Sequence, residues 1–159
     1  MATSQYIREA VNPTVVPVAT ASLVNIGDFA ALVAGECVPA LDFTWTSNLA
    51  TTQTNFASAF LGHSPQYKPA NVAYVYGNGT DNVITMSTSG VYEADLDSAT
   101  TLVVGDWVGM AKDSGNNLLS QTVAKVDAVA KAIGTVVEAG TSLTRCRFRL
   151  LPTVVPFAR

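Results

Sequence analysis

Short runs of β-branched and other apolar residues, separated by turn residues, recur through most of the chain. The runs are 15–18, 22–26, 29–33, 72–76, 83–86, 92–96, 101–104, 107–111, 118–123, 132–138 and 143–151. β-Branched residues fit a pleated, half-buried surface, and the Gly-, Asp- and Asn-rich clusters between the runs supply turn conformations. Many short strands with regular turns are typical of a small antiparallel β-barrel or sandwich. The pattern therefore predicts a mainly β fold.

One segment, residues 47–61, departs from the strand pattern and predicts a single amphipathic α-helix. Ser47 and Asn48 are suited to capping its N-terminus, and Gly62 follows where a helix commonly ends. Apolar residues recur within it at roughly helical spacing. They are Leu49, Phe56, Phe60 and Leu61. We expect this stripe to pack in the core rather than to line a ligand groove, and residues 63–69 to form a surface linker.

The two ends of the chain are predicted to extend from the body. Residues 1–12 are polar and are interpreted as an N-terminal arm, residues 13–151 as a single β-rich domain, and residues 152–159 as an extended tail. Neither end can build a core of its own, so we expect each to dock on the body, a sister subunit or a partner. The candidate partner-binding residues at the ends are Tyr6, Ile7, Val154, Val155 and Phe157.

Two short sequence echoes accompany this organisation. Pro13–Pro17 recurs letter for letter as residues 152–156, and proline at both borders favours an extended or edge segment because proline donates no ladder hydrogen bond. Residues 23–29 and 102–107 each combine a strand, a Gly-Asp turn and an aromatic-led strand. Chance can produce echoes this short, so they do not establish a duplication.

Composition narrows the classes of partner. Charged residues make up 13% of the chain and hydrophobic residues 48%, with a net charge of −3. Proteins that grip phosphate backbones are basic, so nucleic acid is not an expected partner. The sequence contains no uninterrupted run of about 20 apolar residues, so no membrane-spanning helix is predicted. The N-terminus lacks the features of a secretory signal. The low charge instead favours a surface that a partner covers. Cys37 and Cys146 are expected to be buried free thiols, with one long-range disulfide as the alternative.

Candidate chemistry is sparse. His63 is the only histidine, and it lies in a Gly-His-Ser-Pro stretch that we interpret as a surface turn rather than the site of a general base. Two cysteines and one histidine, unclustered, do not form a recognisable zinc site. Residues 95–97 and 113–117 resemble fragments of calcium loops without the remaining ligands and are interpreted as solvated turns. We therefore expect no enzyme activity, no cofactor and no metal.

The charged residues form two alternating runs. On a strand, alternation places three basic residues on one face and three acidic residues on another. The basic residues are Arg145, Arg147 and Arg149, and the acidic residues are Glu93, Asp95 and Asp97. The runs can be two independent solvated faces, or two ladders that meet within a sheet or between subunits, where arginine pairs with carboxylates. A third interpretation, in which the arginines bind phosphate, is less favoured because the net charge of the chain is negative.

Several of these motifs resemble the decoration, or cement, proteins of tailed-bacteriophage heads. The motifs are a Gly-Asp turn leading to a Val-Gly-x-Ala strand within 102–111, an Ile-Gly-x-Val-x-Glu-Ala strand within 132–140, and the Arg-rich strand 145–150. The stretch from 42–45 to 60–62 also looks like phage structural proteins, and the likeness covers roughly residues 20–150.

The resemblance implies a small β-rich subunit, often trimeric, that sits on the capsid exterior and clamps neighbouring major capsid proteins. It carries over no catalytic residue. We therefore expect a structural virion protein, made in the host cytoplasm, that is a homo-oligomer with a trimer favoured, binds the major capsid protein and stabilises the shell. The alternative is a receptor- or glycan-binding module of a phage tail or surface adhesin.

Overall fold

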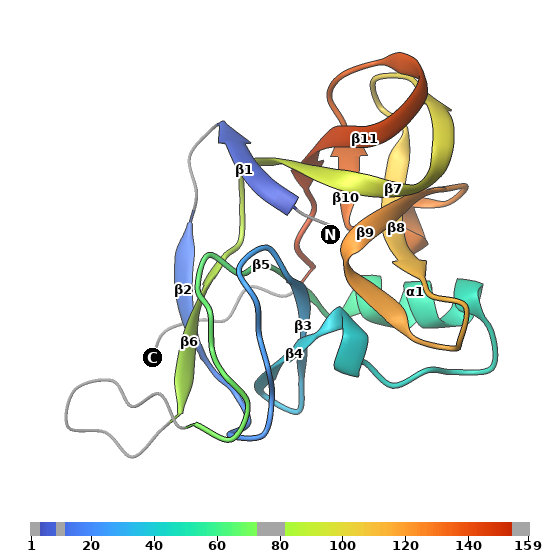
Figure 1. Ribbon diagram of the computed structural model, residues 1–159. Helices are drawn as coiled ribbons and strands as arrows, with labels where there is room; N and C mark the ends of the chain where they lie inside the picture. Colours follow the sequence, from blue (N-terminus) through green and yellow to red (C-terminus); the bar gives the residue numbers. More distant parts are fainter. Residues whose placement is uncertain (1–3, 9–11, 73–81, 154–159) are drawn as a thin grey trace.

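The computed structural model describes residues 4–8, 12–72 and 82–153, whose strands form two sheets (Figure 1). The six-stranded sheet has the order β1 (Ser4–Arg8), β7 (Val91–Leu102), β11 (Gly140–Leu150), β10 (Gly134–Val136), β8 (Trp107–Lys112) and β9 (Leu118–Val126). The five-stranded sheet has the order β2 (Pro13–Pro17), β6 (Val83–Ser87), β5 (Phe60–His63), β3 (Phe29–Val33) and β4 (Glu36–Pro39). The helical elements are α1 (Leu49–Ser58) and the 3-10 turns η1 (Ala40–Asp42) and η2 (Val129–Lys131). The predicted mainly β fold with one α-helix is confirmed.

Strands β7 to β11, hereafter the C-terminal barrel, close on themselves. β7 pairs antiparallel with β11, and its residues Asp95 and Leu96 also pair in parallel with Thr122 and Val123 of β9. β1 adds to β7 as a further antiparallel strand. Strands β2 to β6, hereafter the N-terminal sheet, curl in the same way, and an isolated parallel bridge links Val18, just after β2, to β4.

The N-terminal sheet and the C-terminal barrel share one topology, strand for strand. Strands β2, β3, β4, β5 and β6 correspond in order to β7, β8, β9, β10 and β11, and the two pairing orders are the same. The registers coincide as well. Corresponding pairs are Leu32–Cys37 and Met110–Val123, His63–Ser87 and Thr135–Arg149, Ala30–Gly62 and Val108–Gly134, and Val16–Ile84 and Ala94–Cys146. Because a slip of one residue turns every side chain to the opposite face, equal register gives the two halves equivalent faces.

A pair of equivalent turns accounts for the second sequence echo. The residue before each aspartate is a glycine with positive φ, +97° at Gly27 and +96° at Gly105. The aspartate side chain accepts a hydrogen bond from the backbone N–H three residues earlier, at 2.8 Å for Asp28 and 2.9 Å for Asp106. Both are type II turns, which require glycine or asparagine at this position. Each turn leads directly into the corresponding strand, β3 or β8.

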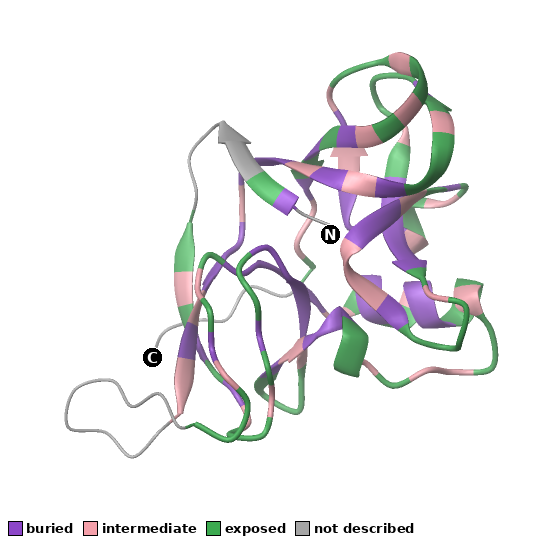
Figure 2. Cartoon of the chain, viewed as in Figure 1, coloured by how far each residue is buried: buried purple, intermediate pink, exposed green. Residues whose placement is uncertain are grey.

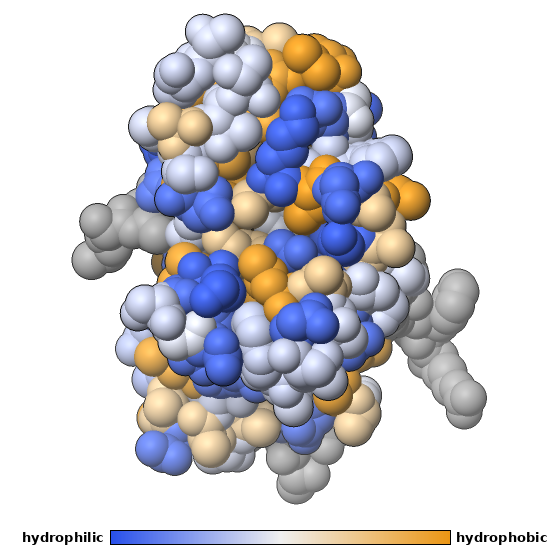
Figure 3. All heavy atoms as spheres, turned by 90° about the vertical axis from the view of Figure 1, so that its right-hand side faces the viewer, coloured by the Kyte–Doolittle hydropathy of each residue, from blue (hydrophilic) through white to orange (hydrophobic). Residues whose placement is uncertain are grey.

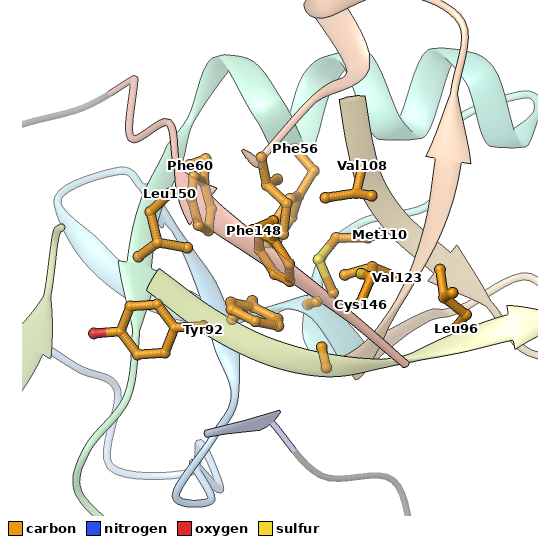
Figure 4. Close-up of a cluster of buried hydrophobic side chains, with 14 of the residues drawn as sticks. Phe56, Phe60, Tyr92, Leu96, Val108, Met110, Val123, Cys146, Phe148 and Leu150 are labelled. Carbon is orange, nitrogen blue, oxygen red and sulfur yellow. The ribbon is translucent and has the colours of Figure 1, made fainter. Parts of the chain in front are cut away.

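The main hydrophobic core spans both halves of the molecule. Phe29 of β3 and Phe60 of β5 join Phe56 of α1 and the interior residues of the C-terminal barrel in one buried cluster, part of which Figure 4 shows around Phe148. The rings of Phe29 and Phe148 lie 5.7 Å apart between centroids. From Tyr92 to Asp97 of β7, buried residues alternate with more exposed ones (Figure 2), as a strand with one face toward a core requires.

A smaller cluster fills the N-terminal sheet. Its buried members are Val16, Val18, Val24, Ala30, Cys37, Leu61, Ile84 and Met86. Ala30 therefore faces this cluster, whereas its neighbours Phe29 and Ala31 face the main core, so β3 is covered on both sides. A strand covered on both faces has a continuous apolar sequence, which explains the unbroken run of β3.

Several side-chain hydrogen bonds join the two halves, among them one from the Gln121 amide to the Ile26 backbone oxygen at 3.1 Å. The amide of Gln53 in α1 donates to the backbone oxygen of Met110 at 2.8 Å, in a buried position. Gln121 of β9 donates to the carboxylate of Asp28 at 2.8 Å. The backbone N–H of Leu41 donates to the Ser120 hydroxyl at 3.0 Å. Together with the shared core, these bonds fix the N-terminal sheet against the C-terminal barrel.

The predicted helix is present but shorter than 47–61. Asn48 caps α1, accepting a hydrogen bond from the Thr51 N–H at 2.9 Å, as its position predicted. The helix ends at Ser58, because Phe60 and Leu61 belong to β5. Gly62 is therefore a strand residue rather than a helix terminator. A Cβ there would lie 2.1 Å from the Ser87 backbone oxygen, so glycine permits β5 and β6 to approach closely.

The prediction of a surface linker at 63–69 holds for Pro65 and Tyr67, which are exposed, but is wrong for three buried residues of the segment. His63, Ser64 and Lys68 are buried, with Ser64 and Lys68 at 0% exposure. Lys68 lies opposite Val24, and burial lowers the pKa of its ammonium group. That group donates to three backbone oxygens, those of Thr20 (2.9 Å), Ser22 (2.8 Å) and Pro69 (3.2 Å). A buried charge needs such partners, and they tie the two loops of this region together.

Some strand predictions also need correction. The run 22–26 forms no extended strand, only the single bridge of Val24 to Lys68. The runs 92–96 and 101–104 belong largely to one long strand, β7, which ends at Leu102. Most of the run 72–76 lies outside the described residues.

Candidate interaction surface

The acidic and basic runs meet as neighbouring strands of one sheet. On β7 and β11, Glu93 lies opposite Arg147 and Asp95 opposite Arg145. The Arg145 guanidinium contacts Asp95 at 2.8 Å and Glu93 at 2.9 Å, and Arg147 contacts Glu93 at 3.0 Å. The sequence left two main interpretations of these runs open. The interpretation that the two ladders meet within a sheet is confirmed, and the interpretation that they are independent solvated faces is wrong.

Glu138 extends this ion-pair ladder. Its carboxylate contacts Arg147 at 2.8 Å, and the two neighbouring carboxylates raise the pKa of the Arg147 guanidinium. The ladder borders a shallow depression of about 180 Å³ lined by Glu93, Glu138, Ala139, Leu143, Arg145, Cys146 and Arg147. Because both arginines already engage carboxylates, the depression is not a ready anion site.

The remaining residues of the two runs lie beyond the ladder. Arg149 continues β11 opposite Val91 rather than opposite an acidic residue. Asp97 lies further along β7, where its carboxylate accepts a hydrogen bond from Ser98 at 3.3 Å. The structure therefore brings four of the six predicted charged residues into one cluster.

Of the predicted partner-binding residues at the chain ends, the structure describes only the backbone of Tyr6 and Ile7. Tyr6 and Ile7 belong to β1, with Tyr6 opposite Tyr92 of β7, whereas their side chains lie outside the described part of the structure. Val154, Val155 and Phe157 lie outside the described residues altogether. Residues 4–8 thus pair with the body as a strand.

A buried polar contact that the sequence did not suggest joins β1 to β5. His63 Nε2 lies 3.0 Å from the Ser4 hydroxyl, and that hydroxyl donates to the backbone oxygen of Gly27. The imidazole packs on Tyr92 with ring centroids 4.2 Å apart, and burial lowers its pKa to about 4. Because His63 is buried, its interpretation as a surface-turn residue is wrong.

The direction of these hydrogen bonds argues against a nucleophile–base pair. The Ser4 hydroxyl donates its proton to a backbone carbonyl. The neutral imidazole therefore donates from Nε2 to the hydroxyl oxygen and does not accept the serine proton. Within the described residues, His63 Nδ1 has no hydrogen-bond partner, so no carboxylate orients the ring as in a catalytic triad. Ser4 and His63 are 59 positions apart, and no local pattern signals the contact.

Large apolar side chains are exposed at many points of the surface. They are Val15, Leu23, Ile26, Val33, Leu41, Tyr67, Val72, Val103, Val104, Trp107 and Val129. On the face shown in Figure 3, hydrophobic and hydrophilic residues are interspersed rather than gathered in one patch. An open groove of about 430 Å³ is lined mainly by apolar residues of the β3–β4 hairpin, the segment after η1 and the end of α1.

The described residues show neither a metal cluster nor a disulfide. They contain no group of three or more His, Cys, Asp or Glu side chains placed to hold a metal ion. Cys37 and Cys146 are buried free thiols, as predicted, and burial raises the pKa of each to about 12. None of the helices in this part of the chain has the length and apolar character to span a bilayer.

No protein-family model and no curated protein matches this sequence.

Proposed function

We propose that this chain is a structural virion protein that binds the outside of a phage capsid and cements neighbouring major capsid subunits. The supporting observation is its surface. Eleven large apolar side chains are exposed on the described residues, while the densest charged cluster is already paired within the chain. Each apolar side chain that a partner covers stabilises the complex in proportion to its buried area, by about 25 cal/mol per Å². Such a surface suits permanent attachment better than turnover.

The resemblance to head decoration proteins supports the same proposal. The resemblance rests on the Gly-Asp turn before β8, the stretch 132–140, the Arg-rich strand β11 and the stretch from 42–45 to 60–62. By the same resemblance, we propose a homo-oligomer with a trimer favoured. Light scattering at micromolar concentration tests this: a trimeric mass supports it, and a strict monomer contradicts it.

Co-sedimentation with empty shells tests the attachment. The shells are assembled from the major capsid protein encoded beside this chain, and the purified chain is added in excess. We expect saturable binding at a fixed ratio of chains to capsid subunits and, in purified virions, hundreds of copies by mass spectrometry. A chain that stays in the supernatant, or a gene with no capsid neighbour, contradicts the proposal.

A glycan- or receptor-binding module is the second candidate, and two exposed aromatic side chains favour it. Trp107 is 36% exposed and Tyr67 is 49% exposed. Aromatic rings of this kind have an apolar face and a polar tip, which suits partly wet contacts. Glycan-array binding that is lost in Trp107→Ala, together with a few copies per virion, would favour this candidate over the first.

A further inference from the structure

The two most exposed large apolar side chains occupy equivalent positions in the two halves of the molecule. Val104 is 66% exposed and Ile26 is 62% exposed, the highest values among the large hydrophobic residues described. Each is the residue before the glycine of a Gly-Asp turn. Those turns lead into β8 and β3, which Figure 1 shows in different halves of the molecule.

Both turns are held rigidly. Beyond the aspartate contacts, each glycine N–H donates to a neighbouring strand segment, Gly27 to Ser64 at 2.8 Å and Gly105 to Val136 at 3.0 Å. The returning N–H of Ser64 or Val136 then donates to the aspartate backbone oxygen, at 2.8 Å in both halves. A side chain on such a turn loses little backbone freedom when it binds a partner.

The fold does not require an apolar residue at either position. Proline is common at this place in a type II turn, and an exposed β-branched side chain adds nothing to the core. The turns also present little net charge. Asp28 is buried, and Asp106 is paired with Lys125 at 2.6 Å. An uncharged, apolar recess is the complementary partner surface.

We propose that Ile26 and Val104 are two copies of one contact point, which insert into the same apolar recess on two neighbouring shell subunits. This inference rests on the proposed cementing function. A shell repeats one surface at regular spacing, and a chain that repeats one rigid apolar turn matches that repetition. Two linked contacts bind far more tightly than one, by about 10²–10⁴-fold where the geometry fits.

The test uses Ile26→Asp, Val104→Asp and the double variant, with Leu41→Asp as a matched control. Leu41 is similarly exposed, at 53%, but lies on η1 rather than on a Gly-Asp turn. Binding to the same empty shells is measured by co-sedimentation and by the rate of release after dilution. The urea midpoint of each variant confirms that folding is unchanged.

We expect each single variant to lose at least about tenfold in apparent affinity, the two losses to agree within about threefold, and the double variant to bind at background level. The control should bind as the wild type does. A single variant with wild-type binding overturns the two-point contact, and so does a control that loses as much. If the wild type itself fails to bind shells, the cementing function is overturned, and this inference falls with it.

Discussion

The two halves of the molecule share topology and register but differ in what covers the same position. Phe29 and Trp107 are equivalent, each leading its strand after a Gly-Asp turn. Phe29 is fully buried, packed against Phe148 of the other half, whereas Trp107 is 36% exposed. Strand pairing therefore sets the direction in which a side chain points, and a neighbouring sheet decides whether that face is buried.

Charge separates the halves in the same way. The ladder residues Glu93, Asp95, Arg145 and Arg147 correspond to Val15, Pro17, Val83 and Thr85 of the N-terminal sheet. The surface of β7 and β11 thus carries four charged residues, whereas the equivalent positions on β2 and β6 carry none. One backbone arrangement tolerates both, which indicates that the ladder is an addition to the fold rather than its basis.

The largest expected effect comes from the glycine shared by both halves. Gly62 and Gly134 are equivalent, and a Cβ would lie 2.1 Å from the Ser87 oxygen at the first and 2.2 Å from the Phe148 ring at the second. We expect Gly62→Ala and Gly134→Ala each to lower the free energy of unfolding by about 3 kcal/mol or more, because the clashing atoms are backbone or packed core. Urea unfolding measures this.

Gly115→Ala is the control for these two variants. Gly115 is exposed, and its nearest neighbour is a side-chain oxygen of Asp113 at 3.2 Å. Its stability should stay within about 0.5 kcal/mol of the wild type. A Gly134→Ala protein as stable as this control would show that the Phe148 ring moves freely, and the equivalence of the two close approaches would be lost.

A histidine-dependent pH effect is expected from the N-terminal sheet, because its His63 corresponds to Thr135 of the C-terminal barrel. The folded pKa of His63 is about 4, against an ordinary value of 6.5. Between those values the unfolded chain binds a proton that the folded chain does not, so stability falls as the pH drops from 6.5 to 4. The loss attributable to His63 is about 3 kcal/mol.

His63→Gln removes this dependence. Burial raises the pKa of Asp28, which works in the opposite direction, because the folded chain then takes up the proton of this carboxyl more readily than the unfolded chain. The comparison of wild type with variant cancels that contribution. Urea unfolding at several pH values between 7 and 4 is the measurement, and parallel pH profiles for the two proteins would contradict the prediction.

A smaller effect should distinguish the two turn aspartates. Asp28→Ala leaves the Asn25 N–H and the Gln121 amide without this acceptor in a buried place, which costs about 2 kcal/mol. Asp106→Ala removes a bond to the Val103 N–H and a pair with Lys125 nearer to solvent, which costs about 1 kcal/mol. Asp28→Asn keeps one of the two acceptor oxygens, so it should recover only part of the loss. Equal losses at Asp28 and Asp106 would show that burial does not separate the turns.

Local patterns predicted the elements of this fold better than their contacts. The short apolar runs 83–86 and 107–111 became β6 and β8, and the capping residue Asn48 marks the start of α1. The end of α1 was missed because Phe60 and Leu61 fit a helical stripe and a buried strand equally well, and a neighbouring strand decides between them. The Gly-Asp echo marked equivalent turns, but pairing orders were needed to show the equivalence.

For the site residues too, local patterns predicted which residues share a face but not which residues they contact. Alternation of Arg145 and Arg147 predicted a one-sided basic face, and strand pairing supplied its acidic partners. Burial of Lys68 and His63 had no local signal, since both sit among turn residues. Backbone oxygens distant in sequence hold the lysine, and Ser4 of the first strand contacts the histidine, so only the folded chain reveals them.

The smallest expected effect is that of the ion-pair ladder, tested by giving it the residues of the N-terminal sheet. Glu93→Val and Arg147→Thr introduce the residues found at Val15 and Thr85, and the double variant completes a cycle. We expect a coupling of about 0.5–1 kcal/mol, because cross-strand charge pairs near solvent contribute little. Glu93→Val should cost more than Arg147→Thr, since the Glu93 carboxylate contacts two arginines and its side chain is only 15% exposed. The coupling should shrink in 1 M NaCl, where charges are screened beyond about 3 Å. A coupling above about 2 kcal/mol that persists in salt would make the ladder a principal support of the C-terminal barrel, and the resemblance of the two halves would then rest on different forces.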